Sequence, residues 1–477
     1  MSEKKSIFAT EPVGKLIVKF AIPCVIALVV NALYNIVDRI FIGRGVGYPG
    51  NGATSVVFPI TIIALALAVL VGDGGTAFLG LKLGEGDKES VKKGVGNSLV
   101  MVTVAGVAIM VIFPVLIEPV LKLFGATEAN YEYAFDYGWI IAIGLPFTMI
   151  STAVNAMIRV DGSPKYAMFS MLLGAIINTV FDPIFIFVFK MGVSGAAIAT
   201  VMGQVASFIV SVLYKRKSKT LSVSADSLKL SGKTCGNILS LGVSSFITQF
   251  AISIVMIIFS NLIKKYGALS VYGEDICRSA MGIVMKVNQI MLSILVGIAV
   301  GAQPVIGYNY GSKNFIRVRK AFIIAIAAAE IIAFIFFFIF QFAPMSVVIL
   351  FGSKEGLYNE FAVKCFRIFL MLCLLNGFRT VAAIYLQAEG KPVKSAVITL
   401  CRQIVFLLPA VFILPLYLGV EGILWSGPVA DSLAFILALA LIWWEIHTLK
   451  KKGIIKHKQH NHKDETAEIL SEGENNL

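Results

Sequence analysis

Three polar residues stand on one face of the first apolar segment of the chain. Asn31, Tyr34 and Asp38 are spaced i, i+3 and i+7, so a helix brings them to the same side. A carboxylate within a segment apolar enough to cross a bilayer is costly, and it usually marks a functional site with a partner elsewhere. The sequence therefore predicts a site around Asp38 that includes residues from another segment.

Asp182 is the expected partner of Asp38. Each acid follows a basic residue that marks the start of its apolar segment, Lys19 for Asp38 and Lys165 for Asp182. At 1.5 Å per residue, the two carboxylates lie roughly 28 Å and roughly 26 Å along their helices. Because both helices are expected to run in the same direction, the two carboxylates reach the same depth.

Neutral oxygen atoms surround the expected position of the two acids. Asn178 lies one helical turn before Asp182, and Thr200 lies in the following segment. Pro183 has no N–H, so it releases the carbonyl of Thr179 from its helical hydrogen bond. Carboxylate, amide, hydroxyl and carbonyl oxygens suit a proton or a small hard cation. The alternative is that both acids are ordinary polar residues near the membrane interface.

Composition places the chain among polytopic membrane proteins. Of its 477 residues, 57% are hydrophobic and 14% are charged, which is unlike a soluble globular protein. The net charge of +13 arises from basic residues in short loops, so nucleic acid is not an expected partner. The six cysteines lack metal-ligand spacing, and the sequence contains no nucleotide-binding, zinc-protease or serine-hydrolase motif. We therefore expect a non-enzymatic protein with no metal site and no catalytic residue.

Twelve apolar runs long enough to span a bilayer occur between residues 16 and 447. Lysine and arginine concentrate at the N-terminus, after the even-numbered runs and in the C-terminal tail, which predicts that both termini are cytoplasmic. The predicted fold class is an all-α polytopic membrane protein with two pseudo-symmetric six-helix bundles. The parts are an N-terminal lobe (1–214), a cytoplasmic linker (215–236), a C-terminal lobe (237–447) and a disordered cytoplasmic tail (448–477).

The two halves of the chain repeat each other. Gly162 and Gly192 correspond to Gly390 and Gly419. At one spacing of 227 residues, a second set matches in order: Gly74, Gly80, Gly84 and Asp87 with Gly301, Gly307, Gly311 and Asn314. Repeats in the same orientation are related by an axis along the membrane normal, and transporters place substrate in the cleft between such bundles.

Several motifs, taken in order, resemble those of the multidrug and toxic compound extrusion family over nearly the full length. The motifs are NIVDRIFIGR (35–44), GGTAFLGLKLGEGD (74–87), DGSPK (161–165), NTVFDPIF (178–185) and EGKP (389–392). The resemblance implies export of amphipathic, often cationic, compounds driven by inward flow of H⁺ or Na⁺, without a cofactor.

The resemblance also implies roles for individual residues. In the branch of the family with an acidic site in the N-terminal lobe, the matching cation-coupling residues are Asp38, Asn178, Asp182 and Thr200. Pro23 would allow the first helix to bend, and the cavity of this lobe would include Asn31, Tyr34, Asn155 and Met171. Another branch uses carboxylates in the C-terminal lobe. There this chain has Gln249, Arg379 and, at the repeat position of Asp182, Ala410, so a second cation site is not expected.

Two further acids, Asp73 and Glu330, lie deeper than the expected pair, roughly 15–16 Å from the ends of their helices. Because an isolated charge there is costly, the sequence favours pairing with a buried base such as Arg379, Arg402 or Lys286. A role of either acid in coupling is the alternative.

The preferred hypothesis is therefore a secondary active antiporter that exports amphipathic drugs in exchange for H⁺ or Na⁺. It is expected to be a monomer in the inner, or plasma, membrane of the cell. One alternative is a lipid-linked oligosaccharide flippase, because the wider superfamily includes such proteins and Lys286, Arg379 and Arg402 could face an anionic headgroup. A second alternative is a receptor or scaffold without transport.

Overall fold

Helices account for the regular structure of the described residues. The computed structural model describes the backbone of residues 7–124, 126–128, 130–218, 224–350 and 356–474, with side chains except at 48, 49, 446 and 449–474. In these ranges eleven helices are long and apolar enough to cross a membrane, and the bent pair Leu357–Phe369 with Cys373–Ala388 supplies a twelfth span. The predicted all-α fold with twelve spans is confirmed.

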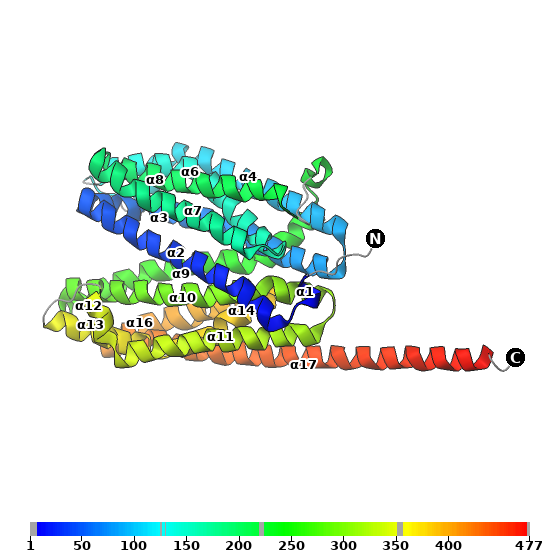
Figure 1. Cartoon of the computed structure of the whole chain (residues 1–477). Coiled ribbons are helices and arrows are strands. Elements are labelled where there is room, and N and C mark those ends of the chain that lie inside the picture. Colours follow the sequence, from blue (N-terminus) through cyan, green and yellow to red (C-terminus); the bar gives the residue numbers. More distant parts are fainter. Residues whose placement is uncertain (1–6, 125, 129, 219–223, 351–355, 475–477) are drawn as a thin grey trace.

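The first six spans form the N-terminal lobe, and the last six form the C-terminal lobe (Figure 1). The spans of the N-terminal lobe are α2 (Val13–Gly45), α3 (Tyr48–Glu85), α4 (Lys88–Val115), α6 (Tyr131–Val160), α7 (Pro164–Pro183) continued by the π-helix η1 (Ile184–Val188), and α8 (Gly192–Leu213). Those of the C-terminal lobe are α9 (Gly232–Ala268), α10 (Gly273–Gly311), α11 (Phe315–Phe342), α13 (Leu357–Phe369) with α14 (Asn376–Ala388), α15 (Pro392–Leu400) with the π-helix η5 (Cys401–Leu407) and α16 (Leu408–Leu418), and α17 (Val420–Glu474).

Shorter helices connect the spans. They are α1 (Ile7–Thr10), α5 (Ile117–Leu123), α12 (Pro344–Leu350) and the 3-10 turns η2 (Tyr214–Arg216), η3 (Ala225–Leu228) and η4 (Cys373–Leu375). Helix α1 and the projecting part of α17 lie at the same end of the bundle (Figure 1). We call this end the terminal side and the opposite end the distal side.

The repeat predicted from the sequence is visible in local geometry. Asp87 and Asn314 both cap a helix: their side-chain oxygens accept the backbone N–H three residues on, at 3.0 Å and 3.3 Å. Gly162 and Gly390 both adopt positive φ, 88° and 79°, a conformation that favours glycine. Equivalent turns therefore begin equivalent spans in the two lobes.

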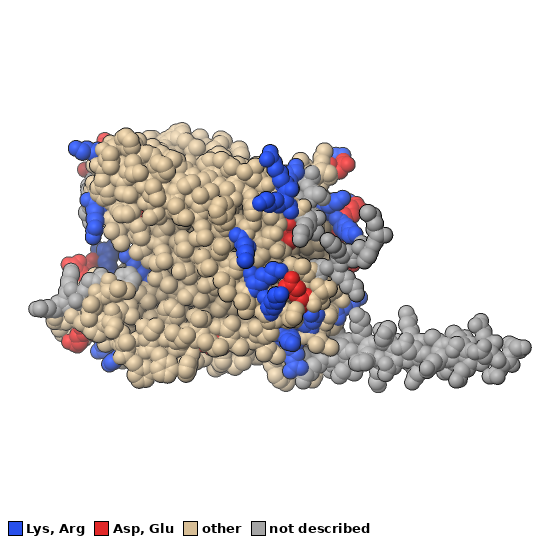
Figure 2. Space-filling model, in the orientation of Figure 1, with Lys and Arg blue, Asp and Glu red and all other residues tan. Residues whose placement is uncertain are grey.

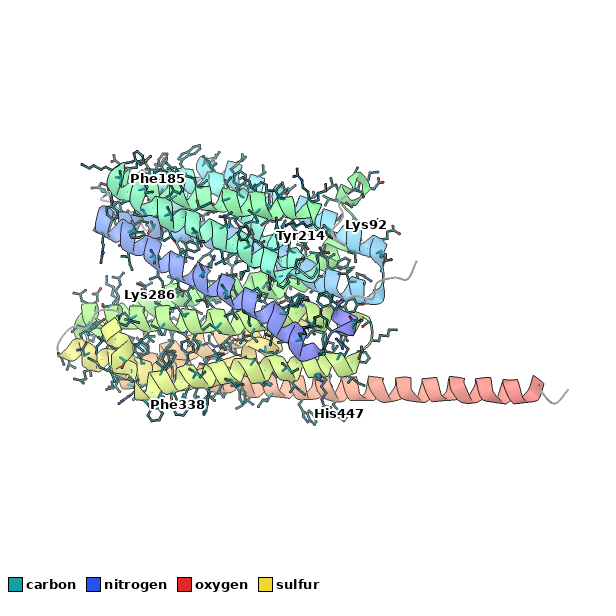
Figure 3. The ribbon with its side chains drawn as sticks, viewed as in Figure 1. Lys92, Phe185, Tyr214, Lys286, Phe338 and His447 are labelled. Carbon is teal, nitrogen blue, oxygen red and sulfur yellow. The ribbon has the colours of Figure 1, made fainter. Side chains whose placement is uncertain are left out.

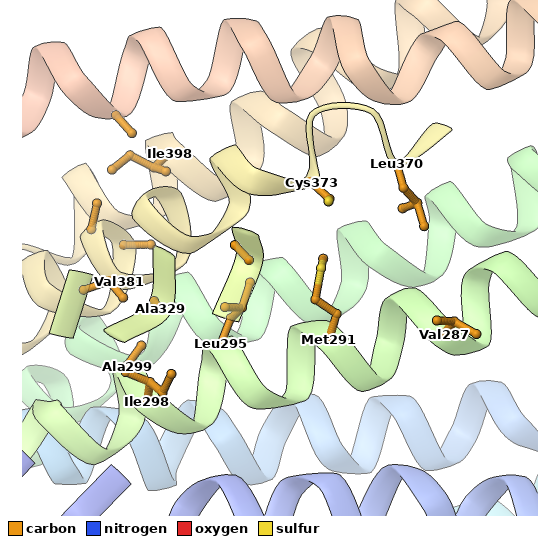
Figure 4. Close-up of a cluster of buried hydrophobic side chains, with 14 of the residues drawn as sticks. Val287, Met291, Leu295, Ile298, Ala299, Ala329, Leu370, Cys373, Val381 and Ile398 are labelled. Atoms are coloured by element: carbon orange, nitrogen blue, oxygen red, sulfur yellow. The ribbon is translucent and has the colours of Figure 1, made fainter. Parts of the chain in front are cut away.

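Each lobe has its own apolar core, and the first span of each lobe begins in the core of the other. Leu16 and Phe20, at the start of α2, belong to the C-terminal core that contains Met291 (Figure 4). Ile238 and Leu241, at the start of α9, belong to an N-terminal core cluster. The two lobes are therefore joined on the terminal side by an exchange of helix ends.

Glycines allow the lobes to touch closely on the terminal side. A Cβ on Gly84 would overlap the carbonyl oxygen of Tyr308, and a Cβ on Gly311 would overlap that of Leu81. Gly84 and Gly311 are repeat positions, and they face each other across the interface. The pseudo-two-fold axis therefore passes close to this contact.

The linker between the lobes is fastened to α4. The Asn97 side chain is fully buried, and its amide nitrogen donates to the carbonyls of Ser227 and Lys229 at 3.1 Å and 3.0 Å. Its oxygen accepts the backbone N–H of Ser231 at 2.8 Å and also contacts the thiol of Cys235. One side chain of the N-terminal lobe, Asn97, thus holds the start of α9 in place.

The structure differs from the sequence prediction in two elements. The tenth span begins at Leu357 and is interrupted between Phe369 and Asn376. The carboxylate of Glu330 accepts the backbone N–H of Phe378 in the first turn of α14, which has no helical partner after the break. Helix α17 continues to Glu474, so residues 448–474 are helical where disorder is predicted, and 475–477 lie outside the described residues. The last span supplies the helix nucleus, and the Lys, Glu, Ala and Gln residues that follow extend it.

Replacing Gly84 by valine should weaken closure of the terminal side, because the side chain cannot fit against the backbone of α10. The measurement uses spin labels at the exposed positions Lys92→Cys and Lys320→Cys, in a background without the native cysteines. The distance between the two labels should show a longer population in the Gly84→Val variant. Gly282→Val is the matched control, since a Cβ there meets no neighbouring atom. An unchanged distance distribution would contradict this account of the interface.

Replacing Asn97 by alanine should lower the free energy of unfolding by about 2–3 kcal/mol, because several buried groups of the linker lose their partner. The melting temperature in detergent should fall accordingly. Asn237→Ala, at an exposed position of α9, should leave it unchanged. Equal melting temperatures for the two variants would show that the linker is not held by this side chain.

Candidate functional site

Asp38 and Asp182 meet inside the N-terminal lobe. Asp38 lies two turns before the end of α2, and Asp182 lies at the end of α7, next to Pro183 and the π-helix η1. Their carboxyl groups lie close enough for the charge of one acid to act on the other. The Asp182 side chain is fully buried.

Asn178 and Thr200 lie beside this pair. The Asn178 amide donates to Oδ1 of Asp182 at 3.3 Å and to the hydroxyl of Thr200 at 3.1 Å. These bonds join α7 to α8 and fix the orientation of the Asn178 amide. The structure thus brings together all four residues that the sequence assigns to cation coupling.

Several oxygen atoms of this cluster are buried without a hydrogen-bond donor among the described residues. They are Oδ1 of Asp38, Oδ1 of Asn178 and Oδ2 of Asp182. An unsatisfied buried acceptor is unfavourable, and a proton or a small cation would relieve it. The donor set is made of hard oxygen atoms, which bind such ions.

Aromatic hydroxyls border the acid pair. The charges of Asp38 and Asp182 both act on the Tyr34 hydroxyl. Asn31, one turn earlier on α2, accepts a hydrogen bond from the Asn35 amide at 3.3 Å. Tyr137 of α6 is also buried close to both acids, and the sequence reasoning missed it. The sequence gives little indication that Tyr137 belongs to the site, because tyrosines are common near membrane interfaces whatever their function.

The other residues of the expected cavity lie elsewhere in the lobe. Asn155 is roughly 27 Å along α6 from Tyr137, and its amide contacts Ser170 and Ser211 in a buried cluster. Met171 follows Ser170 on α7 and is half-buried. The predicted substrate residues therefore form two groups, Asn31 with Tyr34 near the acids and Asn155 with Met171 near the terminal side. Helix α2 is continuous through the buried Pro23.

The deeper acids do not pair with the expected bases. Glu330 bonds to the backbone N–H of Phe378, and Asp73 lies beside the Ser245 hydroxyl of the other lobe. Among the described residues, neither acid forms an ion pair with Arg379, Arg402 or Lys286. The partners of both acids therefore lie on other spans, Phe378 on α14 and Ser245 on α9.

Instead, the basic residues of the C-terminal lobe have other partners. Nε of Arg402 donates to Oδ1 of Asp431 at 2.7 Å, and Arg379 donates to Oδ1 of Asn376 at 2.9 Å and 3.2 Å. Asp431, which the sequence reasoning also missed, is buried and contacts the Asn376 amide. This lobe thus holds an internally compensated charge pair rather than two adjacent acids.

Comparisons with known proteins agree with this architecture. The sequence model of the family described as MatE matches residues 23–184 and 243–413, one segment in each lobe. The multidrug export protein MepA of Staphylococcus aureus (strain MRSA252) is 25% identical over 439 residues, which cover 91% of this chain and 95% of that protein.

Solved structures show the same fold. One, described as the outward-facing conformation of a multidrug resistance MATE family transporter of the MOP superfamily, superposes with a TM-score of 0.87 at 25% identity, over 94% of this chain and all of that one. Another, of a MATE protein in the bent conformation, gives a TM-score of 0.85 at 25% identity, over 95% of this chain and 99% of that one.

Replacing Arg402 by methionine should lower the free energy of unfolding by about 3–5 kcal/mol, because it leaves the buried Asp431 carboxylate without its counter-ion. Adding Asp431→Asn should restore much of that loss, since the buried charge is then removed. Melting temperatures of the single and double variants in detergent test this. A double variant no more stable than Arg402→Met alone would show that the pair does not act as a compensated unit.

Proposed function

The chain belongs to the MatE family, the multidrug and toxic compound extrusion transporters, and from this premise we propose that it is a secondary active antiporter. Its cargo is amphipathic, mostly cationic compounds, and its driving ion is H⁺ or Na⁺. The family predicted from the motifs is confirmed, and with it a multi-pass membrane transporter rather than an enzyme.

The observation that carries the proposal is the meeting of Asp38 and Asp182. The two acids are far apart in the sequence, they lie on different spans, and they present buried oxygen atoms that lack donors among the described residues. A bound proton or sodium ion offsets their mutual repulsion, whereas a departing cationic substrate restores it. Competition between ion and substrate for one negative site gives exchange, which is the basis of antiport.

The arrangement of the lobes supports an order of events. The lobes touch through Gly84 and Gly311 on the terminal side, while the acid pair lies toward the distal side. Lys and Arg side chains gather mainly on the terminal side (Figure 2), which favours a cytoplasmic location for it. In this conformation the driving ion reaches the acid pair from outside and the substrate leaves in the same direction. Bending of α2 at Pro23 is the proposed link between the acid pair and lobe movement.

The alternatives receive less support. A flippase would use Lys286, Arg379 and Arg402 to hold an anionic headgroup, but Arg402 is paired with Asp431 and Arg379 donates to Asn376. A receptor or scaffold does not explain the buried acid pair. A monomer remains the prediction.

Replacing Asp38 or Asp182 by asparagine should lower gradient-driven dye efflux at least tenfold, because the amide cannot exchange the charge. Efflux of a cationic dye is measured in everted vesicles, first under a pH gradient and then under a Na⁺ gradient. Asp136→Asn, an exposed acid one residue from Tyr137, should retain full activity. Efflux by the wild type that ignores both gradients, or full activity of both asparagine variants, would refute the proposal.

A further inference from the structure

A cavity opens between the two lobes near the distal side. Its volume is about 390 Å³, and it is lined by Arg39, Ile40 and Gly43 of α2, Asn51, Thr54 and Ser55 of α3, and Lys286 of α10. The surface is notched between the lobes, with basic side chains inside the notch (Figure 2). Lys286 lies on the side of α10 that faces α2 (Figure 3). Each lobe therefore contributes one cation to the same cavity.

The lining is positively charged and contains no acid. Arg39 and Lys286 carry the charge and the Asn51 side chain adds an amide, whereas the hydroxyls of Thr54 and Ser55 donate to the Asn51 carbonyl at 3.0 Å and 2.9 Å. Asp38 is the neighbour of Arg39 in the chain, but its carboxyl is directed to Asp182 inside the N-terminal lobe. The Arg39 guanidinium stacks over the Phe58 ring, 5.3 Å from its centroid, which limits its rotation.

The two cations form no ion pair within the described structure, although the charge of Asp38 acts on Arg39. Neither Arg39 nor Lys286 forms an ion pair with a described Asp or Glu, whereas Arg402 of the same fold does. Lys286 is partly buried within a membrane-spanning helix, where an uncompensated charge is costly and usually functional. Because the two like charges face each other across the cleft, their repulsion opposes closure of the distal side. An anion between them would remove that repulsion.

We propose that this cavity binds the carboxylate of an amphipathic zwitterionic substrate. The inference rests on the proposed function and narrows its substrate class. Asp38 and Arg39 are consecutive residues of α2, so the acid pair and the cavity lie at the same level of this helix on different faces. The proposed substrate is therefore long enough to extend from one face to the other. The amine goes to the acid pair, and the carboxylate goes to Lys286 and Arg39. Binding the carboxylate from both lobes couples substrate binding to the approach of the lobes.

The test uses two dyes that differ only in this charge: a fluorescent rhodamine with a free carboxylate, and its methyl ester, which is a plain cation. Efflux of each is measured in proteoliposomes under the gradient that drives the wild type. Lys286→Gln should lower efflux of the carboxylate dye about tenfold, because one charge-assisted hydrogen bond is lost. The same change should alter efflux of the ester less than about twofold. Lys286→Arg should retain efflux of both dyes.

The matched control is Lys264→Gln, which removes an exposed lysine of the same lobe outside the cavity; it should affect neither dye. Equal loss of efflux of both dyes in Lys286→Gln, or unchanged efflux of the carboxylate dye, would overturn the inference.

Repeating the assay with and without phosphatidylglycerol distinguishes a substrate carboxylate from a lipid phosphate as the anion in the cavity. A Lys286→Gln defect that affects both dyes and appears only with this lipid would assign the cavity to a lipid phosphate and overturn the carboxylate site.

The two proposals fail in different ways. If the wild type exports the ester under a gradient while Lys286→Gln treats both dyes alike, only the carboxylate site is refuted. If the wild type exports neither dye under either gradient, the antiporter itself is refuted.

Discussion

The close backbone contact between the lobes on the terminal side is the constraint on which the rest of the structure depends. Side chains larger than hydrogen at Gly84 or Gly311 would separate α3 from α10. With the contact formed, the two bundles diverge toward the distal side, where the acid pair and the basic cavity lie. The separation of the lobes near both charged features thus follows from two positions that carry no functional group.

The two lobes share a backbone plan but use charge differently. In the N-terminal lobe, Asp38 and Asp182 lie together, and their surplus negative charge suits a mobile positive ion. In the C-terminal lobe, Asp431 is matched with Arg402, and Ala410 stands where the repeat would place an acid. A compensated pair has little reason to bind or release an ion. The fold is nearly symmetric, whereas the ion chemistry belongs to one half.

The sequence predicted those features that depend on length and periodicity. Spans follow from apolar runs, and the level of Asp38 and Asp182 follows from counting residues along straight helices. Asn178 is predictable because it lies one turn from Asp182 on the same helix. Repeat glycines such as Gly162 and Gly390 are recognisable because one backbone conformation requires them.

Other features depend on contacts that no local pattern records. The interruption after Phe369 is invisible to hydropathy, because the residues between α13 and α14 are as apolar as a span. Tyr137 and Asp431 reach their partners only through packing of helices distant in the sequence. The same holds for Asp73, whose neighbour is a hydroxyl of the other lobe rather than the predicted base.

The exchange of helix ends between the lobes has a mechanical consequence. The start of α2 is embedded in the C-terminal core, and the start of α9 is embedded in the N-terminal core, where Asn97 also holds it. Rotation of the C-terminal lobe therefore moves the start of α2, and rotation of the N-terminal lobe moves the start of α9. A change in the angle between the lobes must therefore displace the starts of α2 and α9 together, or bend both helices beyond those starts.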